Sequence, residues 1–175
     1  LIGPFLDLVI DLSNNQPFNE LAPLSEKDNK LREREELITR FFAYGDGLDG
    51  YHDRVSPFLF AYAKKMNAEM EITPALILEY RQRFVDTMAF IARVFPYGFR
   101  RNERGKDTPR TRFEAIAIGS YLALQERRGL AAETPDVTAW LESPEFKGVI
   151  GSDGANVVAK LRGRLEFVRN KLVGA

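Results

Sequence analysis

The stretch Glu35-Glu36-Leu37-Ile38-Thr39-Arg40-Phe41-Phe42-Ala43-Tyr44 places an arginine inside an apolar run with helical spacing. A second stretch, Phe95-Pro96-Tyr97-Gly98-Phe99-Arg100-Arg101, places arginines beside aromatic residues at the end of another apolar stripe. Glu36 and Arg40 stand four positions apart, an order that favours an ion pair on a helix. Arg40 is therefore either on a solvated helix face or partly buried beside Phe41 and paired with a carboxylate or with carbonyls.

Helical periodicity continues on both sides of these stretches. A stripe of apolar residues begins near Ser56-Pro57, and proline is tolerated in the first turn of a helix. A longer helix is predicted from Thr73-Pro74 to about Phe95. The residues that mark these two helices are Val55, Phe58, Leu59, Tyr62 and Met66, then Ile77, Phe84, Met88, Ile91 and Phe95.

The remaining apolar stripes are also helical. Phe5 to Leu12 form a short stripe that turn residues Asn14, Asn15 and Pro17 close, and Leu31, Ile38, Phe41 and Phe42 mark a helix that ends near Gly45. Thr111 with Glu114 predicts a capping box. Thr134-Pro135 predicts the start of a short helix around Trp140, and Ser152-Asp153 predicts the cap of a last helix. The predicted class is all-α, an irregular bundle of about six or seven helices.

Composition limits the classes of protein. The 175 residues carry no net charge and no cysteine, which excludes disulfides and thiolate chemistry. The absence of cysteine fits a cytoplasmic protein, which is our expectation. No apolar run approaches the roughly 18 residues of a membrane span, so we expect no membrane partner. We expect one helical domain, residues 1–175, and the start at Leu1 inside an apolar pattern indicates a piece of a longer polypeptide.

We predict no catalytic residue, metal site or cofactor in this chain. His52 is the single histidine, and without a second one nearby it is interpreted as a solvated loop residue. Asp46, Asp49 and Asp53 lack the spacing and the terminal glutamate of a calcium loop. No glycine-rich segment has the context of a P-loop or a dinucleotide site, and Gly151-Ser152-Asp153-Gly154 is interpreted as a helix cap rather than an anion site.

The segment from Arg100 to Arg112 is the best candidate for binding. It holds six basic residues against two acidic ones, and we expect it either to contact phosphates or to be a solvated loop paired with the acidic N-terminal half. Phe99 and Tyr97 are expected to be close enough to stack on a base. The basic residues are Arg100, Arg101, Arg104, Lys106, Arg110 and Arg112. A further basic face is expected on the last helix, with Lys160, Arg162, Arg164, Arg169 and Lys171 exposed.

The pattern from Glu36 through Arg40 and Phe41 to Ala43, and the turn Gly98-Phe99-Arg100, resemble the ParB/sulfiredoxin-like domain-of-unknown-function family. That family includes the GmrS half of GmrSD modification-dependent restriction systems. The resemblance extends to Arg164-Leu165-Glu166-Phe167-Val168 near the end of the chain. It implies that Glu36, Arg40, Phe41, Phe99 and Arg100 form a structural motif of the helical region that follows the family's catalytic domain.

The family's nuclease activity is attributed to an N-terminal domain with an Asp-Gly-Gln-Gln-Arg motif, and this chain lacks that motif. It also lacks the histidines of the additional nuclease that some members carry. The resemblance thus implies a non-catalytic module from the C-terminal side of an NTP-dependent DNA endonuclease, with that protein's N-terminal domain as a partner. The basic segment 100–112 makes DNA a further expected partner. The alternative is a helical protein-interaction or structural module without a nucleic-acid role.

Overall fold

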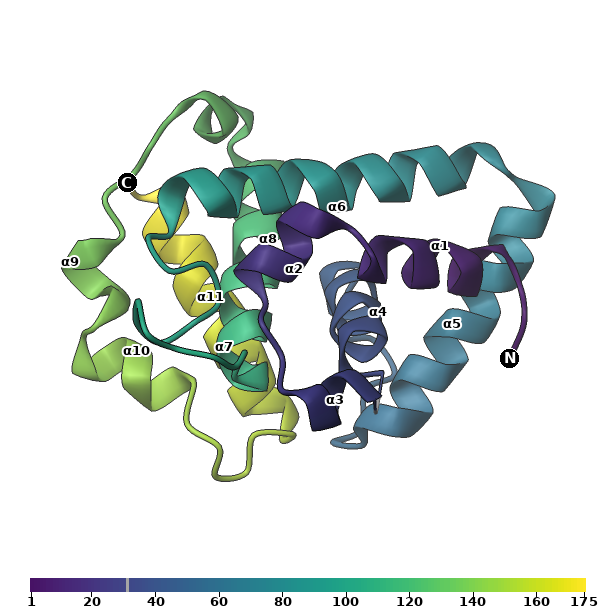
Figure 1. Ribbon diagram of the computed structural model, residues 1–175, viewed down its shortest axis with the longest axis horizontal. Helices are drawn as coiled ribbons and strands as arrows, with labels where there is room; N and C mark the ends of the chain where they lie inside the picture. Colours follow the sequence, from purple (N-terminus) through teal and green to yellow (C-terminus); the bar gives the residue numbers. More distant parts are fainter. Residues whose placement is uncertain (31) are drawn as a thin grey trace.

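The computed structural model describes residues 1–30 and 32–175, and this part of the chain is all helical, without a strand (Figure 1). The predicted class is therefore confirmed. The elements are α1 (Pro4–Ser13), α2 (Gln16–Leu21), α3 (Glu26–Lys30), α4 (Glu33–Gly45), α5 (Val55–Ile72), α6 (Ala75–Val94), α7 (Arg110–Phe113), a π-helical turn (Glu114–Ile118), α8 (Gly119–Glu126), a 3₁₀ turn (Arg128–Ala132), α9 (Thr138–Leu141), α10 (Pro144–Val149) and α11 (Val158–Val173).

There are more helices than the six or seven that the periodicity predicts, because short ones fill the expected connections. α2 stands where Asn15 and Pro17 predict a turn. The Asn15 side chain accepts a hydrogen bond from the N–H of Phe18 at 3.0 Å, and Pro17 occupies the first turn, so both turn-formers start a helix instead. Leu31, which the sequence places in the second long helix, lies outside the described residues.

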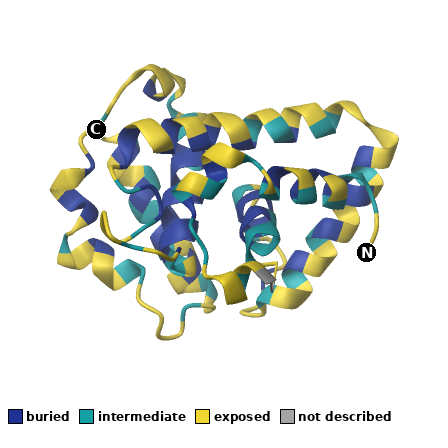
Figure 2. Cartoon of the chain, viewed as in Figure 1, coloured by how far each residue is buried: buried dark blue, intermediate teal, exposed yellow. Residues whose placement is uncertain are grey.

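The core lies beneath α6, where the π-helical turn packs against both α4 and α11 (Figure 2). α4 is buried along its second half, and its Phe41 and Phe42 are fully enclosed. A cluster of edge-to-face aromatic rings extends from there to the Gly98-Phe99 turn: Phe41–Phe84 at 5.3 Å, Phe84–Phe18 at 5.2 Å and Phe99–Phe113 at 4.8 Å between ring centroids. These contacts explain why both opening stretches are rich in phenylalanine.

Residues from Arg110 to Glu126 form one continuous helix that contains the π-helical turn. Its N-terminus is not the predicted capping box. Thr111 donates its hydroxyl to the carbonyl of Ile150 at 2.6 Å, and Glu114 is buried with its carboxylate bound to two arginines. The capping box does not form, because both side chains bind partners that are distant in the sequence.

The last helix also begins differently from the prediction. α11 starts at Val158, several residues after Ser152-Asp153, and neither of these caps it. The N–H of Val158 instead donates to the carboxylate of Asp53, 2.7 Å away and 105 positions earlier in the chain. A carboxylate at this place satisfies one of the free N–H groups of the first turn and suits the positive end of the helix dipole.

Two glycines allow close packing. Gly98 has φ +57°, and a Cβ there would lie 3.0 Å from the carbonyl oxygen of Leu21, the same oxygen that accepts from the N–H of Phe99. Gly119 lies against α11, where a Cβ would be 2.6 Å from that of Val168. The first glycine positions the Phe99 turn, and the second brings α8 and α11 together.

Candidate functional site

The basic segment is divided by the structure into exposed and engaged side chains. Arg101, Arg104 and Lys106 are exposed, and their side chains have no hydrogen-bond or ion-pair partner among the described residues. They follow the Gly98-Phe99 turn in an irregular loop between α6 and α7. These three cations are available to an external anion.

The other three basic residues are held by the protein. Arg100 donates to the carbonyls of Tyr97, at 3.2 Å, and Glu103, at 3.1 Å. Arg110 binds Glu33 through two nitrogens, the closer at 2.9 Å, and so pairs with the acidic N-terminal half as the solvated-loop alternative expects. Arg112 is only 4 % exposed and lies over the ring of Phe146. Burial lowers the pKa of Arg112 below its usual value.

The expected base-stacking role of Phe99 is wrong. Phe99 is 0 % exposed and packs against Phe18 and Phe113, so neither ring face is open to a ligand. Phe99 is positioned by its packing in the aromatic core and not by the arginines that follow it in the sequence.

Glu114 lies at the centre of a buried ion-pair cluster. Its Oε1 accepts from Arg40 Nη1 at 2.6 Å and its Oε2 from Arg164 Nε at 2.8 Å, and all three side chains are at most 4 % exposed. Arg40 also donates from Nη2 to Glu36 at 2.6 Å. Burial disfavours the charged guanidinium, but Glu114 and Glu36 outweigh it and raise the pKa of Arg40. Of the two alternatives for Arg40, burial with a carboxylate partner is confirmed, and the solvated helix face is wrong.

Arg164 is a correction to the exposed face that the sequence predicts for α11. Its side chain is 2 % exposed, with Nε on Glu114 and Nη2 donating to the carbonyl of Ala155. The run of basic residues around it suggests a solvated face. The signal that identifies it is spacing, because Arg164 follows the buried Leu161 by three positions and precedes the buried Val168 by four.

A cleft of about 630 Å³ lies above this cluster. Arg40, Glu114 and Arg164 contribute to its lining from α4, the π-helical turn and α11. Pro109–Thr111 and the loop from Ile150 to Asn156 also border it. Further lining residues are Arg101 and Lys147, both exposed. The cleft therefore gathers five cations and one carboxylate from separate segments of the chain.

The loop that borders the cleft is fastened at several points. Thr111 donates to the carbonyl of Ile150, and Arg164 donates to the carbonyl of Ala155. The Tyr51 hydroxyl donates to the carbonyl of Asn156 at 2.7 Å. Asp53 then binds the first N–H of α11. These contacts come from α7, α11 and the loop before α5, so the wall of the cleft is set by tertiary structure.

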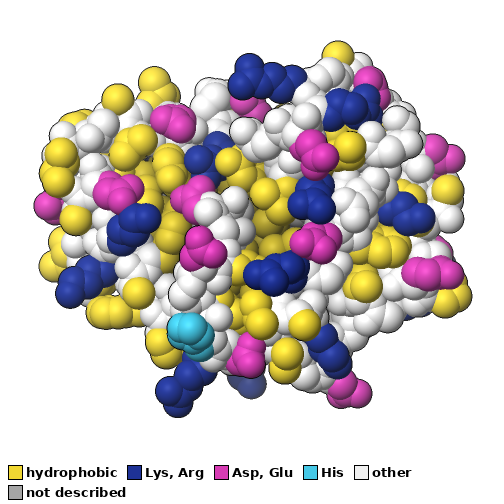
Figure 3. Space-filling view, turned by 180° about the vertical axis from the view of Figure 1, so that it is seen from behind, with side chains coloured by type: hydrophobic (Ala, Val, Ile, Leu, Met, Phe, Trp, Pro, Cys, Tyr) yellow, Lys and Arg dark blue, Asp and Glu magenta, His cyan; other side chains and the backbone are white. Residues whose placement is uncertain are grey.

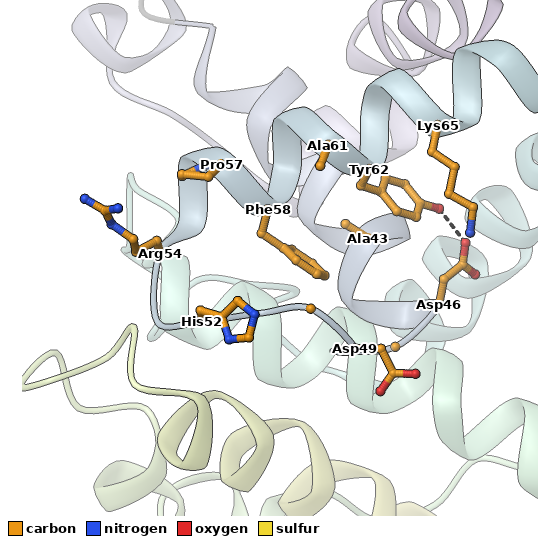
Figure 4. A pocket seen from close by; sticks show the side chains of 12 residues that line it. Ala43, Asp46, Asp49, His52, Arg54, Pro57, Phe58, Ala61, Tyr62 and Lys65 are labelled. Atoms are coloured by element: carbon orange, nitrogen blue, oxygen red, sulfur yellow. Dashed lines mark hydrogen bonds between the residues drawn. The ribbon is translucent and has the colours of Figure 1, made fainter.

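A second hollow, also of about 630 Å³, contains the only histidine (Figure 4). His52 is exposed in the loop before α5, as predicted, and Asp49 points away from Asp46. Asp46 accepts hydrogen bonds from Tyr62 and Tyr80, at 2.8 Å for the latter, and from Arg83 at 2.6 Å. Its carboxylate thus links α4, α5 and α6. Among the described residues no group of three histidines or carboxylates is arranged to hold a metal ion.

Comparisons with known proteins found no match: no family model, no curated protein and no solved structure resembles the chain detectably. Within the described residues, no helix combines the length and the apolar character that crossing a bilayer requires.

Proposed function

We propose that this chain is a non-catalytic helical module of a restriction or phage-defence-like protein. It supports an N-terminal nuclease domain of that protein and contacts the DNA backbone through the basic loop. The observation that carries the DNA contact is the exposure of Arg101, Arg104 and Lys106 on one loop, without partners in the described part of the chain. Cations of this kind bind phosphates without reading the base sequence.

The resemblance of the Arg40-Phe41 and Phe99-Arg100 motifs supplies the restriction-like context. Both motifs pack within the helical body: Arg40 joins the buried cluster and Phe99 the aromatic core. They serve the stability of the module, which suits a domain that holds another one in place. DNA contact is left to the three exposed cations.

The second candidate is a module that binds protein only, and exposed apolar side chains favour it. Ile2 is 91 % exposed, Phe60 59 %, Ile72 83 % and Leu78 69 %. They belong to the first residues, α5 and the start of α6, which lie at the same end of the molecule (Figure 1). In the view from behind, apolar side chains are visible at this end among acidic and basic ones, and also across the middle of the face (Figure 3). A neighbouring domain would cover such a surface.

The test is a titration of the chain with a short DNA duplex at several salt concentrations. Three cations release about three counterions, so log K should fall with log salt with a slope near −2 to −3, from roughly 0.7–0.9 per phosphate contact. Affinity should be equal for duplexes of different sequence, and magnesium should produce no cleavage by this chain alone.

A triple variant, R101S/R104S/K106S, should abolish the binding. A matched control, R54S/K64S/R128S, removes the same charge from exposed side chains without ion-pair partners in the described part of the chain. Equal loss in both variants would show a general charge effect. Absence of binding by the parent at low salt would exclude DNA contact by this chain and favour the protein-interaction module.

A further inference from the structure

The cleft above Glu114 contains a buried hydrogen-bond donor without a partner in the described part of the chain. Arg164 uses Nε for Glu114 and Nη2 for the carbonyl of Ala155, but its Nη1 is buried and has no acceptor among the described residues. Buried side-chain nitrogens of this kind are nearly always bonded in folded proteins, to protein, water or ligand. The Arg164 side chain is 2 % exposed and is one of those that line the cleft.

The charges around the cleft favour an anion as that acceptor. Of the five cations in its lining, Arg40 pairs with Glu114 and Glu36, Arg110 with Glu33, and Lys147 with Glu142 at 3.6 Å. Arg164 shares Glu114, and Arg101 has no ion-pair partner in the described part of the chain. Four carboxylates thus face five cations: Glu33, Glu36, Glu114 and Glu142 against Arg40, Arg101, Arg110, Lys147 and Arg164. A surplus positive charge remains beside a buried free donor.

We propose that this cleft is a binding site for a phosphoryl group, with Arg164 at its floor and Arg101 and Lys147 at its rim. A phosphoryl group carries several acceptor oxygens that point in different directions, as these donors from α11, the basic loop and α10 require. The Ser152 hydroxyl on the bordering loop adds a further donor. The volume of about 630 Å³ lies within the range of small-molecule sites and accommodates a phosphate with attached groups.

The phosphoryl group has two possible sources, a free phosphate compound or the backbone of a nucleic acid. The site shares only Arg101 with the three exposed cations of the proposed DNA contact. Lys147 and Arg164 belong to the cleft alone, and Arg104 and Lys106 to the loop alone. The inference therefore goes beyond the proposed function and can be tested independently of it.

The first experiment is a titration of the chain with inorganic phosphate, followed by NMR of the arginine side-chain nitrogens, with chloride at equal ionic strength as the reference. We expect the Arg164 signals to shift saturably with phosphate but not with chloride. R101S/K147S should weaken phosphate binding about tenfold, because the variant loses two charge-assisted contacts at the exposed rim of the cleft. Both substituted residues are exposed, so this variant is expected to fold.

The matched control R54S/K64S carries the same change of charge on exposed side chains outside the cleft and should bind phosphate like the parent. Equal shifts with chloride and phosphate, or equal phosphate affinity in R101S/K147S and the parent, would overturn the proposal. An ordered water on Arg164 Nη1 that phosphate does not displace would also overturn it, because water would then be the missing acceptor.

The second experiment identifies the source with a short duplex. If a backbone phosphate occupies the cleft, inorganic phosphate should compete with the duplex and K147S should weaken duplex binding. If a free phosphate compound is the ligand, K147S should leave duplex affinity unchanged while R104S/K106S lowers it. Phosphate binding by a chain that binds no duplex would support the cleft and exclude the DNA contact, so the two proposals can fail separately.

Discussion

Glu114 and Arg164 form an ion pair at 2.8 Å although 50 positions separate them, and both side chains are 2 % exposed. Arg40 binds the other oxygen of the same carboxylate. Two guanidinium groups thus share one buried acceptor, a geometry that holds α4, the π-helical turn and α11 together. Loss of any member leaves a charge buried without its full set of partners.

Arg40→Ala should lower the free energy of unfolding by about 3–5 kcal/mol, because it removes one partner of a buried charged pair. Arg81→Ala is the control, since Arg81 pairs with Asp11 at the surface, where ion pairs contribute about 0–1 kcal/mol. Chemical denaturation of both variants measures the difference. Equal stability losses would show that burial adds nothing to the Arg40 pair.

Arg100→Ala should cost less, about 1 kcal/mol, because Arg100 is half-buried and binds only the carbonyls of Tyr97 and Glu103 among the described residues. A midpoint shift in thermal unfolding well below that of Arg40→Ala is the expected result. A loss as large as that of Arg40→Ala would contradict this ranking.

Gly119→Ala should destabilise the protein by about 1–3 kcal/mol, because the new Cβ would meet Val168 at 2.6 Å and the backbone oxygen of Leu165 at 3.0 Å. Gly163→Ala on α11 is the matched control. A Cβ at position 163 would have no described atom within 4 Å, and alanine favours a helix interior over glycine by roughly 0.5–1 kcal/mol. Denaturation midpoints should therefore move in opposite directions.

Asp53→Ala should cost about 1–3 kcal/mol. The change removes the acceptor for the N–H of Val158 and places alanine at φ +58°, a region that aspartate and asparagine tolerate better. Asp53→Asn keeps an acceptor oxygen and should be close to the parent. Ser152→Ala should be near neutral in thermal unfolding; a cost as large as that of Asp53→Ala would restore Ser152 as the cap.

Stability should fall as the solution becomes alkaline. Burial and the hydrogen bond to Asp46 raise the pKa of Tyr80 from 10.0 to about 12, and burial beside Asp46 also raises the pKa of Tyr62. Because the folded pKa lies above the unfolded one, the contribution of Tyr80 is complete below pH 10.0 and is lost as pH rises toward about 12. Phenolate absorbance and circular dichroism should change together. Tyr80→Phe should flatten the decline over this interval, and an unchanged profile would exclude Tyr80 as a cause.

Local sequence patterns predict those helices whose first and last turns are set by residues in or next to the helix itself. α5 and α6 have regular apolar stripes and proline near their first turns, and their bounds follow the prediction closely. The pairing of Arg40 is also accessible to sequence reasoning, because Glu36 stands one turn before it. The α11 cap and the role of Glu114 are not, since their partners Asp53 and Arg164 are 105 and 50 positions away.

The candidate cleft is predictable only in part for the same reason. The basic segment points to Arg101 and Arg110, but it cannot show that Arg110 is occupied by Glu33 or that Arg112 is buried. Lys147 and Arg164 come from α10 and α11, and only the tertiary structure brings them beside the segment. Composition alone suggests six available cations where three are free of partners in the described part of the chain.

The π-helical turn has a consequence for insertions and deletions. Its hydrogen bonds run from i to i+5, so Glu114–Ile118 holds one residue more than a regular helix needs. Deletion of one residue there would restore a regular helix and leave α8 facing its partners, because the wide turn absorbs the extra residue. Deletion of one residue from the regular turn of α7 would instead rotate the later positions by about 100°, the angle of one residue in a turn of 3.6, and move Gly119 away from Val168. Length changes should therefore be tolerated between Asn102 and Asp107, in the exposed loop, and a single deletion should destabilise the fold less within Glu114–Ile118 than within α7.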